Sequence, residues 1–293
     1  MTVAHRALIT GAGGQVGLEL QATAPSDWVV AACPSDQLDV TQADAVRATI
    51  TAFRPTVVIH AAAYTAVDAA EANADLARAV NAEGTAHVAE AAREVGARLV
   101  HLSTDFVFDG AQGRPYAPGD EARPLGVYGR TKLEGERAAA RILDGQALIV
   151  RTAWVYSRHG RNFVLTMLRL MAERDEVGVV ADQVGTPTWA RSLAEALWAA
   201  AGRTDLSGVV HWTDAGVASW YDFAVAIQEE ALAAGLLSRV VTVRPLRTEE
   251  FPSRARRPPF SVLEKGASWE ALGRTPPHWR VNLRRMLEAL ARG

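Results

Sequence analysis

Residues 10–20 read TGAGGQVGLEL and follow the apolar stretch RALIT at 6–10. The glycines at 11, 14 and 17 have the spacing G-x-x-G-x-x-G, at a point where a strand gives way to a helix. We expect Gly11 to form a tight turn, Gly14 to let the backbone approach a pyrophosphate, and Gly17 to allow close packing of helix on sheet. The start of the helix would attract the anion through unpaired N–H groups. A plain glycine-rich turn is the alternative, and the position after a first strand favours a dinucleotide site.

The first half of the chain continues this alternation of short apolar runs and longer helical patterns. The expected strands are 6–10, 28–32, 56–63, 98–104 and 147–156, and the expected helices end at Leu20 or cover 44–53, 75–96 and 128–143. Strands this apolar must be buried on both faces, which requires a parallel sheet covered by helices. With right-handed crossovers, the sequence predicts an α/β fold with a doubly wound parallel sheet of the Rossmann type. Ligands of such sheets lie at the carboxyl ends of the strands.

The pattern changes after Tyr156. The expected helices there are 162–175, 190–202 and 219–235, and the expected strands are 208–213 and 240–246. We expect residues 1–156 to form an NAD(P)-binding Rossmann domain, with 182–218 returning to it. Residues 157–181 and 219–293 would form a smaller α/β substrate domain.

Composition limits the classes of partner. The chain has 293 residues, of which 49% are hydrophobic and 22% charged, and its net charge is −2 from 31 basic and 33 acidic residues. Proteins that bind nucleic acid through phosphates usually carry a basic excess, so no nucleic-acid partner is expected. Cys33 is the single cysteine, which excludes an internal disulfide and favours a reducing compartment, the cytoplasm. No apolar run approaches the roughly eighteen residues of a membrane span, so no membrane partner is expected.

The second strand should end where a cofactor ribose lies. An acidic residue there would bind a ribose 2′-hydroxyl, and an arginine would accommodate a 2′-phosphate. The tip offers neither cleanly, because Asp36 comes only after Pro34. The choice between NADH and NADPH stays open, with a slight preference for NADPH. Asp39 would face the adenine, or else serve as a turn or cap residue.

The stretch HLSTDFVFDG at 101–110 ends the fourth strand with two hydroxyls, Ser103 and Thr104, and YGRTK at 128–132 opens the next helix. Reduction of a ketone needs a hydride on carbon and a proton on oxygen. Tyr128 and Lys132 share one helical face at i, i+4 spacing. An ammonium within about 4 Å would lower the pKa of the phenol from about 10, and Thr104 could hold the carbonyl oxygen. A solvated helical face is the alternative for the Tyr–Lys pair.

Together, these stretches resemble one family. GAGGQVG (11–17), AAAYTAVD (61–68), STDFVF (103–108), YGRTK (128–132), RTAWVY (151–156) and DQVGTPT (182–188) are similar to the extended short-chain dehydrogenase/reductase family. Within it they most resemble the reductases that complete dTDP-L-rhamnose synthesis. The resemblance runs from Gly11 to the Arg257–Pro258 segment.

The resemblance implies a role for individual residues. Tyr128 would donate the proton, Lys132 would tune it and bind the nicotinamide ribose, and Thr104 would bind the 4-keto oxygen. The cofactor would contact Gly11, Gly14, Gln15, Val16, Gly17, Asp39, Val40, Ala61, Ala62, Ala63 and Tyr64. The sugar nucleotide would contact Val67, Trp154, Asn162 and Arg257. For Asn162 a helix N-cap is the alternative, and for Arg257 an ordinary surface position.

The implied reaction is reduction of the C4 ketone of dTDP-4-dehydro-6-deoxy-L-mannose to dTDP-L-rhamnose by NADPH or NADH. Thr104 is followed by Asp105 and Phe106, without the Asp-Glu of related dehydratases, which favours reduction over dehydration. A sibling reductase of another dTDP-4-keto-6-deoxysugar remains open because of Phe260. A non-catalytic NADP-binding regulatory subunit is a further alternative. The histidines and the lone cysteine show no metal-ligand spacing, so no catalytic metal is expected. The family also implies a homodimer and, in some members, magnesium at a subunit contact.

Overall fold

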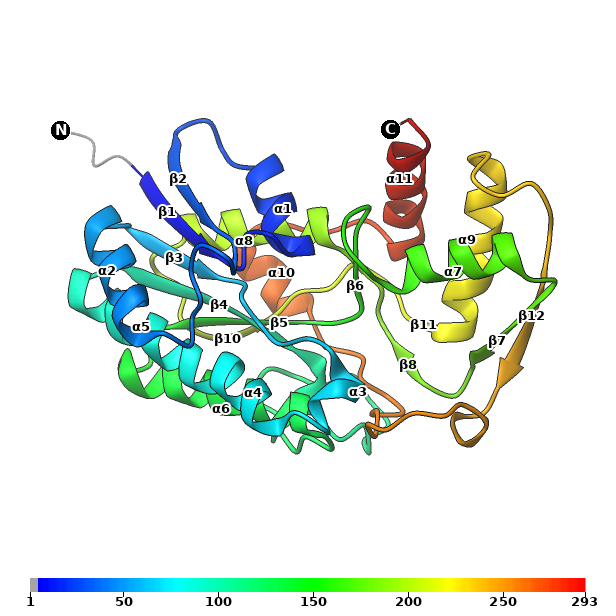
Figure 1. The fold of residues 1–293 in the computed structure, drawn as a ribbon, viewed down its shortest axis with the longest axis horizontal. Coiled ribbons are helices and arrows are strands. Elements are labelled where there is room, and N and C mark those ends of the chain that lie inside the picture. Colours follow the sequence, from blue (N-terminus) through cyan, green and yellow to red (C-terminus); the bar gives the residue numbers. More distant parts are fainter. Residues whose placement is uncertain (1–4, 293) are drawn as a thin grey trace.

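The computed structural model describes residues 5–292 and contains one six-stranded sheet in which every neighbouring pair is parallel (Figure 1). The strand order is β10-β5-β4-β3-β1-β2. Their bounds are β1 His5–Thr10, β2 Trp28–Cys33, β3 Val57–His60, β4 Arg98–Thr104, β5 Leu148–Thr152 and β10 Gly208–His211. The predicted doubly wound fold is confirmed.

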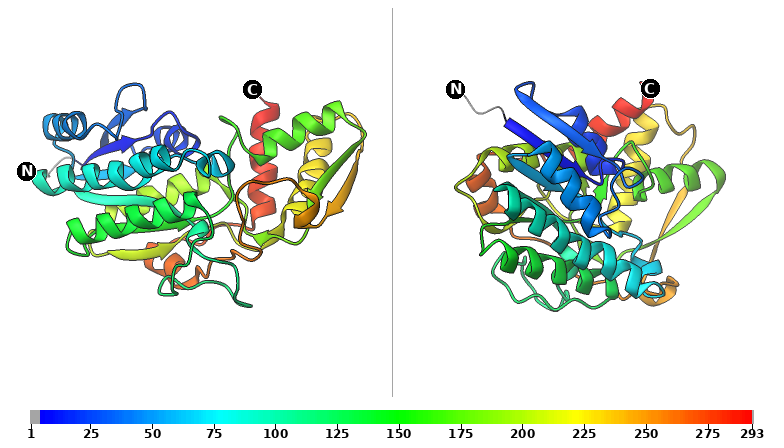
Figure 2. Two further views of the ribbon diagram at one scale, coloured as in Figure 1. Left: turned by 60° about the horizontal axis from the view of Figure 1, so that its bottom comes forward. Right: turned by 60° about the vertical axis from the view of Figure 1, so that its left-hand side comes forward.

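Helices cover both faces of this sheet, which explains why its strands are apolar throughout. On one face, α1 and α8 pack together over Ile9, Val57 and Val150, and α10 lies against α8. On the other face, α2, α5 and α6 pack over Leu8, Val58 and Leu99, and Figure 2 shows α5 and α6 side by side. Their bounds are α1 Gln15–Ala22, α2 Ala43–Phe53, α5 Gly84–Val95, α6 Val127–Ile142, α8 Ala190–Gly202 and α10 Gly266–Leu272. The sheet and these helices are called the large lobe below.

A second hydrophobic cluster forms the small lobe beside the carboxyl edge of the sheet. Its centre joins Met167 and Met171 of α7 to Phe223 and Ile227 of α9 and to Leu283 of α11. The helices are α7 Phe163–Glu173, α9 Trp220–Ala233 and α11 Trp279–Ala291. Three two-stranded sheets complete it: β7 Glu176–Val180 with β12 Thr242–Leu246, β6 Val155–Tyr156 with β9 Thr188–Trp189, and β8 Val184–Gly185 with β11 Ala218–Ser219. Exact domain borders stay a prediction.

Two expectations differ in detail. The strand expected over 147–156 is broken into β5 and β6, because Trp154 has φ +47°, outside the extended region. The helix expected over 75–96 is continuous but changes its hydrogen bonding, with α4 Ala74–Arg78, a π-helical turn at Ala79–Glu83, and then α5. Among the described residues, three helices, α3 (Val67–Ala70), α10 and α11, were not expected.

The topology gathers loops from distant parts of the sequence at one edge. The glycine turn follows β1, the segment 61–64 follows β3, and the short α3 (Val67–Ala70) comes next. A 3₁₀ turn at Asp105–Val107 follows β4. Because parallel strands all end at this edge, these loops face the small lobe.

Candidate active site

The glycine turn after β1 is shaped by close backbone contacts. Gly11 has φ +67°, and a Cβ there would lie 2.6 Å from the backbone nitrogen of Ala62. A Cβ on Gly17 would lie 2.4 Å from the carbonyl oxygen of Gly11. Gly14 is the N-cap of α1 and has no side chain to accept from the first-turn N–H groups. The turn therefore fits an anion such as the pyrophosphate of a dinucleotide.

The segment after β3 lies against this turn. The N–H of Ala62 donates to the hydroxyl of Thr10 at 3.4 Å, and that of Ala61 to the Thr10 carbonyl at 3.3 Å. Further along, the N–H of Tyr64 donates to Asn81 Oδ1 at 2.8 Å, and Asn81 Nδ2 donates back to the Tyr64 carbonyl at 3.2 Å. The structure therefore brings two of the predicted cofactor segments together.

The end of β2 carries no side chain that selects between the two cofactors. The carbonyl of Cys33 accepts from the N–H of Ala12 at 3.2 Å, while Asp36 is exposed beyond it. The Asp39 carboxylate accepts from the N–H and the hydroxyl of Thr41 at 2.9 and 2.8 Å, and the N–H bond holds the pKa of Asp39 below its ordinary value. This is the turn role that the sequence left open, and contact with an adenine stays a prediction. Val40 is buried against Gly84 of α5.

Thr104 and Tyr128 come together where α6 meets the turn after β4. A Cβ on Gly129 would lie 2.1 Å from the carbonyl oxygen of Phe106, so the glycine lets the helix approach this closely. Burial raises the pKa of Tyr128 to about 12; the Thr104 hydroxyl opposes the rise and the Asp105 carboxylate adds to it. The Thr104 hydroxyl donates to Asp105 Oδ1 at 3.1 Å and accepts from the N–H of Phe106 at 3.2 Å.

Lys132 is buried and is held by β4. Its ammonium donates to the Leu102 carbonyl at 2.7 Å and lies 3.5 Å from Nε2 of His101. Burial lowers the pKa of Lys132 to about 8, and Glu136 opposes this. Burial of the phenol sets the direction of the Tyr128 pKa, the Lys132 ammonium is held by β4, and the tuning role expected of Lys132 stays a prediction.

Two residues that connect these parts were missed from the sequence. Asn81 has no exposed surface and also donates to Thr131 of α6 at 3.1 Å, next to Lys132. Glu71 Oε1 accepts from the N–H of Val127, the first residue of α6, at 2.7 Å. Asn81 lies in the π-helical turn, and no local pattern in the sequence marks that turn. These contacts position the helix that carries Tyr128.

Trp154 stands between the two lobes. Its ring stacks on Trp220 of α9 with 3.5 Å between centroids and 5° between planes. A Cβ on Gly185 would lie 2.5 Å from the Trp154 ring, so the indole is clasped between Gly185 and Trp220. With φ +47°, Trp154 holds a conformation that costs backbone energy and is common at functional sites.

Asn162 is an N-cap, as the alternative reading had it. Its Oδ1 accepts from the N–H of Leu165 at 3.0 Å, which caps α7. Its Nδ2 donates to the Ser157 carbonyl at 2.7 Å and to Oε1 of Gln15 at 2.9 Å. Asn162 thus links the glycine turn to the small lobe, and its role toward the sugar nucleotide stays a prediction.

Val67 begins α3, and its neighbour Asp68 pairs with Arg257, whose Nη2 lies 2.7 Å from Asp68 Oδ2. A cavity of about 900 Å³ adjoins this pair and extends between α7, β7 and residues 248–259. Its wall includes the rings of Phe163 and Trp220, the acids Asp182 and Glu249, and the arginines Arg174, Arg254, Arg256 and Arg257. The cavity is therefore partly aromatic and predominantly cationic.

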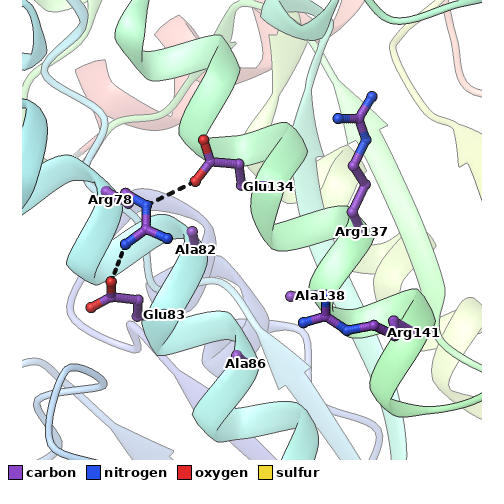
Figure 3. A pocket seen from close by; sticks show the side chains of 8 residues that line it. All are labelled: Arg78, Ala82, Glu83, Ala86, Glu134, Arg137, Ala138 and Arg141. Carbon is purple, nitrogen blue, oxygen red and sulfur yellow. Dashed lines mark hydrogen bonds and ion pairs between the residues drawn. The ribbon is translucent and has the colours of Figure 1, made fainter.

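A second cavity, of about 380 Å³, opens between α6 and the continuous helix formed by α4, the π-helical turn and the start of α5 (Figure 3). Arg78 bridges Glu83 and Glu134 across it, and Arg137 and Arg141 project from α6. None of the residues predicted for the site lines this cavity.

Within residues 5–292, no group of three or more His, Cys, Asp or Glu side chains is arranged to hold a metal ion, and a magnesium site stays a prediction. None of the described helices combines the length and the apolar character needed to cross a bilayer.

Comparison with known proteins identifies the family. The family model described as "RmlD substrate binding domain" matches residues 5–292. A dTDP-4-dehydrorhamnose reductase of Aggregatibacter actinomycetemcomitans is 42% identical over 286 residues, which is 95% of this chain and 97% of the relative. One of Mycobacterium tuberculosis is 44% identical over 294 residues, covering 98% and 94% of the two chains.

The crystal structure of a dTDP-4-dehydrorhamnose reductase from Bacillus anthracis in complex with NADP has a TM-score of 0.91 to this chain at 37% identity, and covers 97% of this chain and 99% of the other. Because the family model and these relatives span nearly the whole sequence, this protein belongs to the RmlD substrate binding domain family, alongside the dTDP-4-dehydrorhamnose reductases.

Proposed function

We propose that this protein reduces the C4 ketone of dTDP-4-dehydro-6-deoxy-L-mannose to dTDP-L-rhamnose with NADPH. One observation carries the proposal: Thr104 and Tyr128 meet at the carboxyl edge of the sheet, the edge that also carries the glycine turn. The names of its near-full-length relatives support the same reaction.

The glycine turn and the segment 61–64 would hold the dinucleotide. Gly14 leaves the first N–H groups of α1 free of side-chain acceptors, which suits a pyrophosphate. NADPH is favoured because the relative from Bacillus anthracis holds NADP and because the tip of β2 carries Cys33 and Pro34 in place of an acid. When bound, NADPH supplies the hydride that adds to C4.

Tyr128 would donate the proton to the C4 oxygen and the Thr104 hydroxyl would orient that oxygen. A phenol with a pKa of about 12 keeps its proton at neutral pH, so the donor is loaded when substrate binds. As the C–O double bond becomes a single bond, the oxygen takes the phenolic proton and Tyr128 becomes a phenolate. Lys132 lies one turn after Tyr128 on α6, and its ammonium donates to the Leu102 carbonyl of β4. It would bind the nicotinamide ribose and stabilise that phenolate.

The cavity of about 900 Å³ would hold the nucleotide part of the substrate. Its size is typical of small-molecule sites, at roughly 300–1,000 Å³. Arginine forks suit a diphosphate and aromatic rings suit a base. Arg257, which lines the cavity, would face the diphosphate, and Val67 and Trp154, which lie outside its lining, would contact the sugar.

The test combines the purified protein, NADPH and a panel of dTDP-4-keto-6-deoxysugars, with NADPH absorbance followed over time. Oxidation of NADPH with the L-lyxo-configured rhamnose precursor, and formation of dTDP-L-rhamnose, is expected. Preference for another 4-keto sugar would support the sibling reductase. NADPH binding without turnover on any sugar would support a regulatory subunit. Phe260 packs with Val107 and Phe108 away from the cavity, which favours the rhamnose precursor.

The assembly and location are proposed with the same function. The family resemblance implies a homodimer, which we propose together with this reaction. Analytical ultracentrifugation of the protein, with and without magnesium, tests both the dimer and its dependence on the ion. A single cysteine suits the cytoplasm.

A further inference from the structure

One carboxylate joins the two lobes beside the cavity. Asp68, the second residue of α3, accepts hydrogen bonds from a segment that comes back from the small lobe, residues 253–257, here called the strap. Ser253 Oγ lies 2.9 Å, the N–H of Ala255 3.1 Å and Arg257 Nη2 2.7 Å from its oxygens. Figure 1 shows this segment passing beside α3. Burial would raise the pKa of Asp68, but the bonds from the strap outweigh it and lower the pKa to about 2, so the group is a carboxylate at neutral pH.

The strap depends on this carboxylate more than an ordinary loop would. Within the described chain, no backbone-to-backbone hydrogen bond involves residues 252–258. The nearest such bonds are those of Phe251 and Pro259, at its two ends. Between these ends side chains set the position of the backbone. Within residues 5–292, Asp68 is the only side chain that accepts from a backbone N–H of the strap, the one at Ala255.

All five strap residues line the cavity of about 900 Å³. The same turn that carries Asp68 also reaches α6, because Glu71 accepts from the N–H of Val127. The wall of the cavity and the start of the Tyr128 helix are therefore both fastened to the α3 turn, directly after Val67. A loosened strap would alter the cavity while the glycine turn, on the other side of β3, keeps its own contacts.

We propose that Asp68 is a positioning residue for nucleotide-sugar binding. It fixes the strap and orients the Arg257 guanidinium, so that the diphosphate meets a preformed cationic wall. Because the strap is already ordered, binding does not have to bear the entropy cost of ordering it. This role rests on the proposed function, because it assigns the cavity to the nucleotide. Asp68 acts through Arg257 and Ala255 and takes no part in proton transfer.

The test uses Asp68→Asn, which removes the charge and keeps the shape. The probes are dTDP and NADPH, titrated separately by calorimetry, and turnover with the 4-keto sugar. We expect the dissociation constant of dTDP and the KM of the sugar nucleotide to rise about tenfold or more. The affinity for NADPH and kcat should change by no more than about twofold to threefold. Hydrogen exchange in peptides that span 253–257 should accelerate.

Glu176→Gln is the matched control. Glu176 pairs with Arg244 at 3.0 Å in the small lobe, both side chains are about half exposed, and neither lines the cavity. Its loss should leave dTDP affinity and strap exchange unchanged. In the double variant Asp68→Asn with Arg257→Gln, the rise in KM should be smaller than the product of the two single rises, since the Asp68–Arg257 contact is lost in each single variant.

Three outcomes would overturn the role. Unchanged dTDP affinity and strap exchange in Asp68→Asn would show that the contact positions nothing. An equal loss of NADPH affinity would show a general structural role. Tighter dTDP binding would show that Asp68 competes with the diphosphate for Arg257. If the unaltered protein failed to bind dTDP, the proposed substrate would be wrong. That result needs only the titration of the unaltered protein, so it is distinguished from a failure of the role of Asp68.

Discussion

The glycine turn and the strap both lie at the carboxyl edge of the sheet and are built in different ways. The turn is held by backbone atoms within about a dozen residues and by the neighbouring strand β3, and Gly11 and Gly17 have no room for a Cβ. The strap is held by side chains nearly two hundred residues away in sequence, through Asp68. A site built from local backbone is rigid without its ligand, whereas one built from distant side chains depends on single contacts. The cofactor side should therefore resist changes that the substrate side does not.

Tyr128 lies between the cofactor side and the substrate side of the site. The substitution Tyr128→Phe should give the largest effect on turnover. Loss of the proton donor should lower kcat by about 10²–10⁴-fold, while NADPH and dTDP affinities stay within a few-fold. Steady-state kinetics and calorimetry measure the two quantities. Tyr221→Phe, the same change on α9 outside the cavity, should leave both unchanged. Normal turnover in Tyr128→Phe would sink the assignment of the donor.

Gly17→Ala should damage the cofactor side alone. Its Cβ would lie 2.4 Å from the Gly11 carbonyl, so either the turn or α1 must shift, at a cost of about 1–3 kcal/mol in the free energy of unfolding. NADPH affinity should fall about tenfold or more with this shift, and dTDP affinity should be retained. Gly119→Ala, exposed and with nothing within 4 Å, is the control. An equal loss of affinity for NADPH and for dTDP would show that the cofactor side and the substrate side are not independent.

Lys132 gives a pH signature. Its pKa is lowered to about 8 in the folded protein from 10.5, so the unfolded chain binds more protons between those values. Below pH 8 the buried lysine is charged, and its burial destabilises the folded protein by the full amount. As pH increases from 8 toward 10.5, this destabilisation is relieved and the free energy of unfolding rises by roughly 3 kcal/mol. Lys132→Met should lack that rise. Denaturation curves at several pH values, compared as differences between the two proteins, test it; parallel curves would contradict the burial of an ammonium here.

Asn162→Asp should give the smallest effect and tests the contact between the two sides. The aspartate keeps the acceptor that caps α7 but loses the donor to Gln15 and Ser157. We expect NADPH affinity to fall about twofold to fivefold, as for the loss of one or two hydrogen bonds of about 0.5–1.5 kcal/mol, with the melting temperature nearly unchanged. Asn162→Ala also removes the cap and should cost about 1 kcal/mol of stability. A normal NADPH affinity in both variants would show that the link to Gln15 is incidental.

The parts that sequence reasoning predicted well are local or periodic. The strands of the large lobe follow from apolar runs, and the turn at Gly11 follows from glycine spacing next to a strand. Trp154 shows the limit: its run RTAWVY looks like a continuous strand, yet the stacking on Trp220 and the close pass of Gly185 require a left-handed residue there. Asn81 shows another limit, because no sequence pattern marks its π-helical turn and its partners come from the segment after β3 and from α6.

The pKa of Tyr128 could not have been predicted from i, i+4 spacing. Spacing puts Tyr128 and Lys132 on one face of α6. The acceptor that holds the ammonium, the Leu102 carbonyl, belongs to the strand β4. Burial of the phenol, a property of the packed lobes, then decides the direction of the shift.

By itself, the sequence determined the doubly wound sheet, the glycine turn and the pairing of a phenol with an ammonium on one helix, because each depends on residue spacing within a short stretch. Only the tertiary structure decided which charge faces which. The pairing of Asp68 with Arg257, the attachment of Lys132 to β4 and the stack of Trp154 on Trp220 each join segments that are separate in the chain. Their energies come from burial and from short distances between atoms, and neither exists until the chain has folded.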